Sequence, residues 1–122
     1  MKNLLFVGLV GMIGSIFRYL ISKNLSGYFG SFPFGIFLVN IIGCFLAGAI
    51  VQYSLNYQKE TSNFLNLFLI VGFCGGFTTF SAFSIDIVNL MNQNKFFILI
   101  TYLGLSTVFG TLFCYLGMNL FK

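Results

Sequence analysis

The sequence has no histidine or tryptophan, one proline, and only six basic and two acidic residues among 122. The absence of histidine excludes histidine-based metal sites and catalytic triads. The basic residues form no run, which excludes a nucleic-acid-binding surface. The three cysteines lie singly in apolar runs without a CxxC pair, so we expect small buried hydrophobic residues. Neither an enzyme nor a nucleic-acid partner is predicted.

Apolar residues dominate what remains. Hydrophobic residues make up 58% of the chain and charged residues 7%, against about 25% charged in a soluble domain. Four apolar runs, at about 4–22, 34–55, 64–91 and 96–121, are separated by polar turns. Each is long enough to cross about 30 Å of hydrocarbon. We therefore predict an all-α integral membrane protein with one transmembrane domain, 1–122, that is multi-pass in the cell (inner) membrane and surrounded by lipid.

The third apolar run has an unusual middle, which reads GFCGGFTTFS over residues 72–81. Paired glycines continue a helix poorly. Backbone without helical hydrogen bonds survives at membrane depth only where it is buried in protein or lines a polar cavity. We predict a broken third helix, interrupted near 75–78. A continuous helix that packs closely on a neighbour is the alternative.

Basic residues are balanced between the two sides of the predicted membrane protein. Lys2, Lys59 and Lys122 fall on one side, and Arg18, Lys23 and Lys95 fall on the other. Because an excess of Lys and Arg normally sets orientation, this sequence specifies none. We expect dual topology, in which two oppositely inserted copies pair as an antiparallel homodimer. The alternative is that weak signals fix one orientation.

Small residues recur in three of the predicted helices, and they let helix backbones approach closely in lipid. They are Gly8, Gly11, Gly14, Gly43, Ala47, Gly48, Ser106 and Gly110. Four short helices alone could hardly enclose and shield a pathway. We therefore expect these residues to serve association between copies.

Polar side chains within the spans are candidate functional groups, because they cost free energy in hydrocarbon unless paired. Asn40 either joins helices or offers N–H donors to an anion. Arg18 either extends to the membrane interface or lies at a pore entrance. Asp86, the only acid within a span, is expected to be hydrated or paired with a base. The other candidates are the hydroxyls of Thr78, Thr79, Ser81, Ser84, Tyr102, Ser106, Thr107 and Thr111.

Phe80 and Phe83 have the i, i+3 spacing that places two side chains on one helix face. Most such pairs face lipid or the core, but the positive edge of an aromatic ring can hold an anion without a formal charge. Conduction requires binding weak enough to permit release. The spans carry no central Lys, Arg or Glu, which argues for passive flow and against a proton-coupled carrier.

Three segments together resemble the CrcB/Fluc family of fluoride channels: GMIGSIFRY (11–19), FPFGIFLVNIIGCFLAG (32–48) and GFCGGFTTFSAFSID (72–86). The match covers nearly the whole chain in order. The resemblance implies a dual-topology homodimer with two fluoride pathways, a phenylalanine box and a structural sodium ion at its centre.

The resemblance also implies roles for individual residues. Asn40 corresponds to the pore asparagine, and Phe80 and Phe83 correspond to the box phenylalanines. Thr79 and Ser81 would lie near the fluoride pathway. The remaining correspondences are Tyr102 and Ser106 in a polar track on the fourth helix, and Arg18 at the wide aqueous entrance.

Sodium, which is not transported, would be held by the backbone carbonyls of Gly75 and Thr78 from both subunits. Two residues depart from the family pattern. Ile36 stands where a threonine is common, and Asp86 stands where a glutamate is common. Neither change removes a pore group, so only local packing and the reach of the acid are affected.

The function that we expect is passive efflux of fluoride from the cytoplasm, which reduces fluoride toxicity. Hydrogen fluoride enters cells as a neutral acid and dissociates there, so an anion channel relieves its accumulation. The alternative is a small dual-topology cation or drug exporter. Such exporters depend on a carboxylate deep in the first helix, and residues 1–22 contain no acid. An accessory protein without transport would leave Asn40, Phe80 and Phe83 unexplained.

Overall fold

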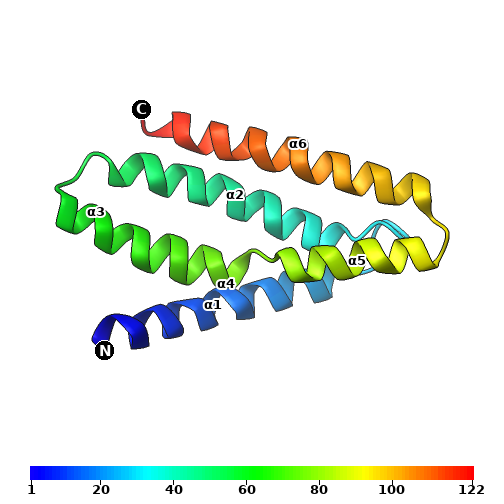
Figure 1. Ribbon diagram of the computed structural model, residues 1–122, viewed down its shortest axis with the longest axis horizontal. Helices are drawn as coiled ribbons and strands as arrows, with labels where there is room; N and C mark the ends of the chain where they lie inside the picture. Colours follow the sequence, from blue (N-terminus) through cyan, green and yellow to red (C-terminus); the bar gives the residue numbers. More distant parts are fainter.

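The chain consists of helices and the connections between them. A computed structural model describes residues Met1–Lys122. The four segments long and apolar enough to cross a membrane are α1 (Lys2–Leu25), α2 (Phe34–Ser54), the third span (Lys59–Asn92) and α6 (Phe96–Leu120). Both termini lie at one end of the molecule, and the connection between α1 and α2 lies at the other (Figure 1). The prediction of an all-α protein with four long apolar helices is confirmed.

The third span is divided into four helical pieces. They are α3 (Lys59–Leu65), the π-helix η1 (Asn66–Cys74), α4 (Gly75–Phe77) and α5 (Phe80–Asn92). Thr78 and Thr79 are extended, with φ/ψ of −81°/156° and −151°/125°. The two glycines in the interval predicted to be broken remain helical in α4. The interruption therefore lies at Thr78 and Thr79, at the C-terminal edge of that interval.

Threonine hydroxyls define where the helices on either side of the break end and begin. Thr78 Oγ1 donates to the Cys74 carbonyl at 2.7 Å. Thr79 Oγ1 accepts from the Ala82 amide at 3.1 Å and caps the N-terminus of α5. An N-cap oxygen satisfies an amide that has no partner within its own helix. The break was predicted at the glycines, whereas the local hydrogen bonds place it at the two threonines.

Glycines bring α1 into close contact with the segment just before the break. A Cβ atom at Gly14 would lie 2.4 Å from the Phe73 carbonyl oxygen. One at Gly76 would lie 2.2 Å from the Gly11 carbonyl oxygen. Only hydrogen fits at these positions, so α1 and α4 pack backbone against backbone.

Glycine performs the same role between α2 and α6, which share the most extensive interface in the molecule. A Cβ atom at Gly48 on α2 would lie 2.1 Å from the Cys114 carbonyl oxygen on α6. Gly8 on α1 differs, because a Cβ atom there would meet nothing within 4 Å. The expectation that small residues serve association between copies is therefore wrong for Gly14 and Gly48. Helices of the same chain already occupy the space that these glycines leave.

The loop of residues 26–33 joins α1 to α2 and folds back over the ends of these helices. Gly27 and Gly30 have positive φ values of 74° and 65°, which favour glycine. Lys95 Nζ donates to Ser31 Oγ and ties the loop to the connection between α5 and α6. The loop thus covers the end of the bundle opposite the two termini.

Candidate functional site

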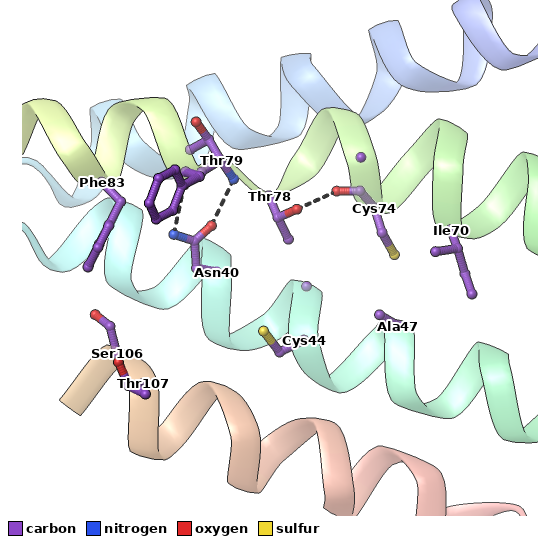
Figure 2. Close-up of a pocket in the computed structure, with 13 residues that line it drawn as sticks. Asn40, Cys44, Ala47, Ile70, Cys74, Thr78, Thr79, Phe83, Ser106 and Thr107 are labelled. Atoms are coloured by element: carbon purple, nitrogen blue, oxygen red, sulfur yellow. Dashed lines mark hydrogen bonds between the residues drawn. The ribbon is translucent and has the colours of Figure 1, made fainter. Parts of the chain in front are cut away.

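A cavity of about 530 Å³ lies between α2, the third span and α6 (Figure 2). We call it the inner cavity. Five of the predicted pathway residues line it, namely Asn40, Thr79, Phe80, Phe83 and Ser106. The two predicted sodium ligands, Gly75 and Thr78, line it as well. Three other predicted site residues, Arg18, Ser81 and Tyr102, do not.

Asn40 connects α2 to the broken third span through both halves of its amide (Figure 2). Its Nδ2 donates to the Thr79 carbonyl at 3.0 Å, and its Oδ1 accepts from the Thr79 amide at 2.9 Å. These two bonds satisfy the backbone of a residue that no helix includes. A side-chain amide nitrogen carries two N–H donors, so Asn40 keeps one donor beyond this clamp. Asn40 can therefore join helices and still offer an N–H group to an ion.

The hydroxyls near the break differ in what they bond. Thr79 and Ser81 share a hydrogen bond of 3.0 Å between their side-chain oxygens. The hydroxyl of Ser106 is buried and has no hydrogen-bond partner. Unpartnered buried polar groups are uncommon in folded proteins and require an explanation. Among the hydroxyls of residues that line the inner cavity, that of Ser106 has no hydrogen-bond partner, although its oxygen has almost no exposed surface.

The two predicted box residues lie side by side at the start of α5. Their ring centroids are 5.9 Å apart with an interplanar angle of 33°. The Phe80 side chain is 78% exposed in the single chain, so one face of the inner cavity is open to whatever surrounds the protein. The ring of Phe83 lies 5.0 Å from that of Tyr102.

Arg18 lies beside the break, where its Nη1 donates to the Thr78 carbonyl at 3.4 Å. Ser15 on the same helix donates to the Gly76 carbonyl at 3.4 Å. Ser15 was not among the predicted site residues. The spacing of residues 11, 14, 15 and 18 could have indicated Ser15, because it is the i, i+3, i+4, i+7 pattern of one helix face. This face of α1 supplies both the close contacts and the donors that the interrupted segment needs.

Asp86 is paired with a tyrosine. The Tyr102 hydroxyl donates to Asp86 Oδ2 at 3.1 Å, and the Tyr102 side chain is 0% exposed. Hydration or a base partner was expected for this acid; its partner is a tyrosine and not a base, and hydration stays a prediction. Tyr102, a predicted pathway residue that lies on α6 outside the inner cavity, is therefore held by the acid of α5.

The carbonyls of Gly75 and Thr78 provide a chemical test of the implied sodium site. In a continuing α-helix the Thr79 amide would donate to the Gly75 carbonyl, but here it donates to Asn40. The Gly75 carbonyl is thereby released from that bond. No group of three or more His, Cys, Asp or Glu side chains could hold a metal ion, so a cation would need backbone oxygens, which suit hard cations. Two carbonyls are too few for a complete shell, and the donor set fits sodium if a second copy adds its own pair.

Comparisons with known proteins show the family of this chain. A family model described as "CrcB-like protein, Camphor Resistance (CrcB)" matches residues 5–118. The chain belongs to this family. Given its four apolar spans, it is a multi-pass membrane protein.

Curated relatives in several bacteria carry the name fluoride-specific ion channel FluC. The Flavobacterium psychrophilum protein is 38% identical over 123 residues, covering 100% of this chain and 98% of the relative. The Prosthecochloris aestuarii protein is 45% identical over 116 residues, covering 95% and 90%. The Francisella tularensis subsp. tularensis protein is 34% identical over 117 residues, covering 93% and 90%. The similarity thus extends over nearly the full length of each chain.

Proposed function

We propose that this protein is a fluoride-selective ion channel of the cell membrane, through which fluoride leaves the cytoplasm passively and fluoride toxicity is reduced. The observation that carries the proposal is the inner cavity, which gathers an amide donor, an unpartnered hydroxyl and two phenylalanine rings beside a helix break. The name of the relatives supports the same ion. An open pathway of this kind performs no covalent chemistry, so the protein is not an enzyme.

Fluoride is small and strongly hydrated, so a pathway must replace its water with other donors. The free N–H of Asn40 and the hydroxyl of Ser106 are the donors that the inner cavity offers. Phe80 and Phe83 add ring edges, which attract an anion weakly. No Lys, Arg or His side chain lines the cavity, so an ion can also leave it. Arg18, half-buried on α1, would attract anions to the entrance.

A second copy of the chain completes the site in this proposal. The exposed face of Phe80 and the balanced charge on the two sides support an antiparallel pair. In such a pair the carbonyls of Gly75 and Thr78 from both copies would hold one sodium ion, which would fix the two breaks against each other. The Arg18 guanidinium would then turn away from the Thr78 carbonyl, because like charges repel.

The small cation or drug exporter has no comparable support. Its chemistry needs a carboxylate in the first helix, and α1 contains none. The relatives described above are named as fluoride channels.

Fluoride efflux from liposomes tests the function directly. We expect purified protein to release fluoride when an ionophore clamps the membrane potential, without accompanying proton movement. Phe80→Ile and Phe83→Ile should each slow the release about tenfold, because an aliphatic side chain has no positive edge. A fluoride electrode measures the rate. Proton-coupled release, or no release by the wild type and both variants alike, would contradict the proposal.

Labelling and cross-linking in one membrane preparation test the antiparallel pair and its cation. Gln93→Cys places a thiol at the exposed connection between α5 and α6. We expect an impermeant maleimide to label about half of these thiols from outside and the rest only after permeabilisation, as dual topology requires. The unmodified chain controls for the native cysteines. Replacing sodium with N-methyl-D-glucamine should lower the yield of cross-linked dimer. Labelling from one side only would refute dual topology, and a yield that ignores sodium would refute the cation.

A further inference from the structure

The loop of residues 26–33 covers a second cavity, of about 270 Å³, at the end of the bundle opposite the two termini (Figure 1). We call it the loop cavity. Asp86 of α5 also lines it. Phe83 lies three residues earlier on the same helix and lines the inner cavity instead. The loop therefore covers the way along α5 from the inner cavity to this end of the molecule.

The loop is attached to the other elements by a single side-chain bond. Lys95 Nζ, in the connection between α5 and α6, donates to Ser31 Oγ. Every other hydrogen bond of the loop joins its own residues or the adjoining ends of α1 and α2. Gly27 and Gly30 have positive φ values, and a Cβ atom added at either glycine would meet nothing within 4 Å. Glycine in open surroundings changes its backbone angles easily, so these two positions can act as hinges.

Phe32 of the loop packs on a predicted pathway residue. Its ring centroid lies 5.4 Å from that of Tyr102, with an interplanar angle of 83°, which is an edge-to-face contact. The Tyr102 ring in turn lies 5.0 Å from that of Phe83, and the Tyr102 hydroxyl donates to Asp86. The Tyr102 side chain is 0% exposed while the loop is in place. Movement of the loop would therefore bring water to Tyr102 and to the Asp86 carboxyl group.

We propose that residues 26–33 form a lid over this end of the fluoride pathway. The lid moves at its two glycines, rests through Phe32 on Tyr102, and is fastened by the bond from Lys95 to Ser31. The inference rests on the proposed function, since the ion is the one that the channel conducts. With the lid closed, an ionised Asp86 repels an approaching anion across a cavity of low dielectric constant. Opening admits water, which weakens that repulsion and hydrates the ion as it leaves.

The rate at which a thiol beneath the lid reacts with a maleimide measures how often the lid opens. Ile36→Cys provides that thiol, because Ile36 lines the loop cavity and is not a predicted pathway residue. In this background Ser31→Ala removes the acceptor of the latch and leaves every charge in place. We expect labelling to become about tenfold faster, the usual size for a hydrogen bond to a charged group, and fluoride efflux to become faster with it. Ser26→Ala, at an exposed residue of the same loop, is the matched control and should change neither rate.

Lys95→Met separates a latch from a simple attraction of anions. If Lys95 only drew fluoride to this end, its removal would slow efflux, whereas removal of a latch makes both labelling and efflux faster. Lys23→Met is the control, because it removes one charge from the same predicted side while the Lys23 ammonium lies over the Tyr19 ring and not on the loop. We expect Lys95→Met to match Ser31→Ala, and Lys23→Met to leave labelling unchanged. Slower efflux in Ser31→Ala, or equal effects of the two lysine variants, would overturn the inference.

A reversible tether tests closure itself. Ser31→Cys and Lys95→Cys in one chain can be joined by a short bifunctional methanethiosulfonate, which takes the place of the lysine side chain and holds the lid closed. Efflux should be lost on tethering and return when a reductant cleaves the tether, and the unmodified chain controls for the native cysteines. A tethered protein that conducts as fast as the untreated one would exclude a lid. Each of these results leaves the channel function standing as long as the wild type releases fluoride, whereas a wild type that releases none contradicts that function.

Discussion

Asn40→Asp is expected to slow fluoride efflux by at least about 100-fold, equivalent to roughly 3 kcal/mol of barrier. Aspartate has nearly the same shape as asparagine and keeps the oxygen that accepts from the Thr79 amide. It loses the Nδ2 donor, so a carboxylate oxygen faces the Thr79 carbonyl where a bond of 3.0 Å exists now. The new charge also lies in the inner cavity, where it repels an anion in surroundings of low dielectric constant.

The matched control for this variant is Asn63→Asp, which makes the same substitution at an exposed position on α3. It should conduct at the wild-type rate, because Asn63 is exposed and does not line the inner cavity. Circular dichroism of both variants should show the helical content of the wild type. An Asn40→Asp protein that releases fluoride as fast as Asn63→Asp would exclude Asn40 from the pathway.

Gly14→Ala is expected to lower the free energy of unfolding by about 3 kcal/mol, at the upper end of overpacking effects. The added methyl group would lie 2.4 Å from the Phe73 carbonyl oxygen and 2.9 Å from the Phe77 amide nitrogen. Both are backbone atoms that cannot rotate away. Either α1 moves outward, which separates the Arg18 donor from the break, or the break itself shifts.

Gly8→Ala is the control for this substitution, since Gly8 lies earlier on the same helix and nothing lies within 4 Å of the added atom. We expect its unfolding free energy to stay within about 0.5 kcal/mol of the wild type. Thermal unfolding in detergent, followed by size-exclusion chromatography, compares the two variants. Equal stabilities would show that α1 packs on the third span less tightly than the distances require.

The four spans could be predicted because hydrophobic length alone identifies them. The grouping of Asn40, Phe80 and Phe83 could also be predicted, since the phenylalanines share a face of α5 and the asparagine is a polar residue among apolar neighbours. The residue at which the third helix breaks could not be predicted. Whether the helix is interrupted at Gly75 or at Thr79 depends on a hydrogen bond from α2. The residues near the break do not indicate which residue of α2 makes that bond.

The sequence also does not indicate which helices the small residues pack against. A glycine that faces another copy and one that faces its own chain follow the same spacing rule. Only the packed structure shows that Gly14 meets Phe73 while Gly8 stays open. A second cavity, beneath the loop of residues 26–33, is lined by Ser22 of α1 and Asp86 of α5, and no periodicity of the sequence indicates that these two residues lie near each other.

The break in the third span also bears on the order in which the protein is made. Its exposed backbone is satisfied by Arg18 and Ser15 from α1 and by Asn40 from α2. These two helices leave the ribosome before the third span does. The groups that bond Gly76, Thr78 and Thr79 are thus already in the bilayer when the third span arrives, so these three residues need not enter lipid without partners.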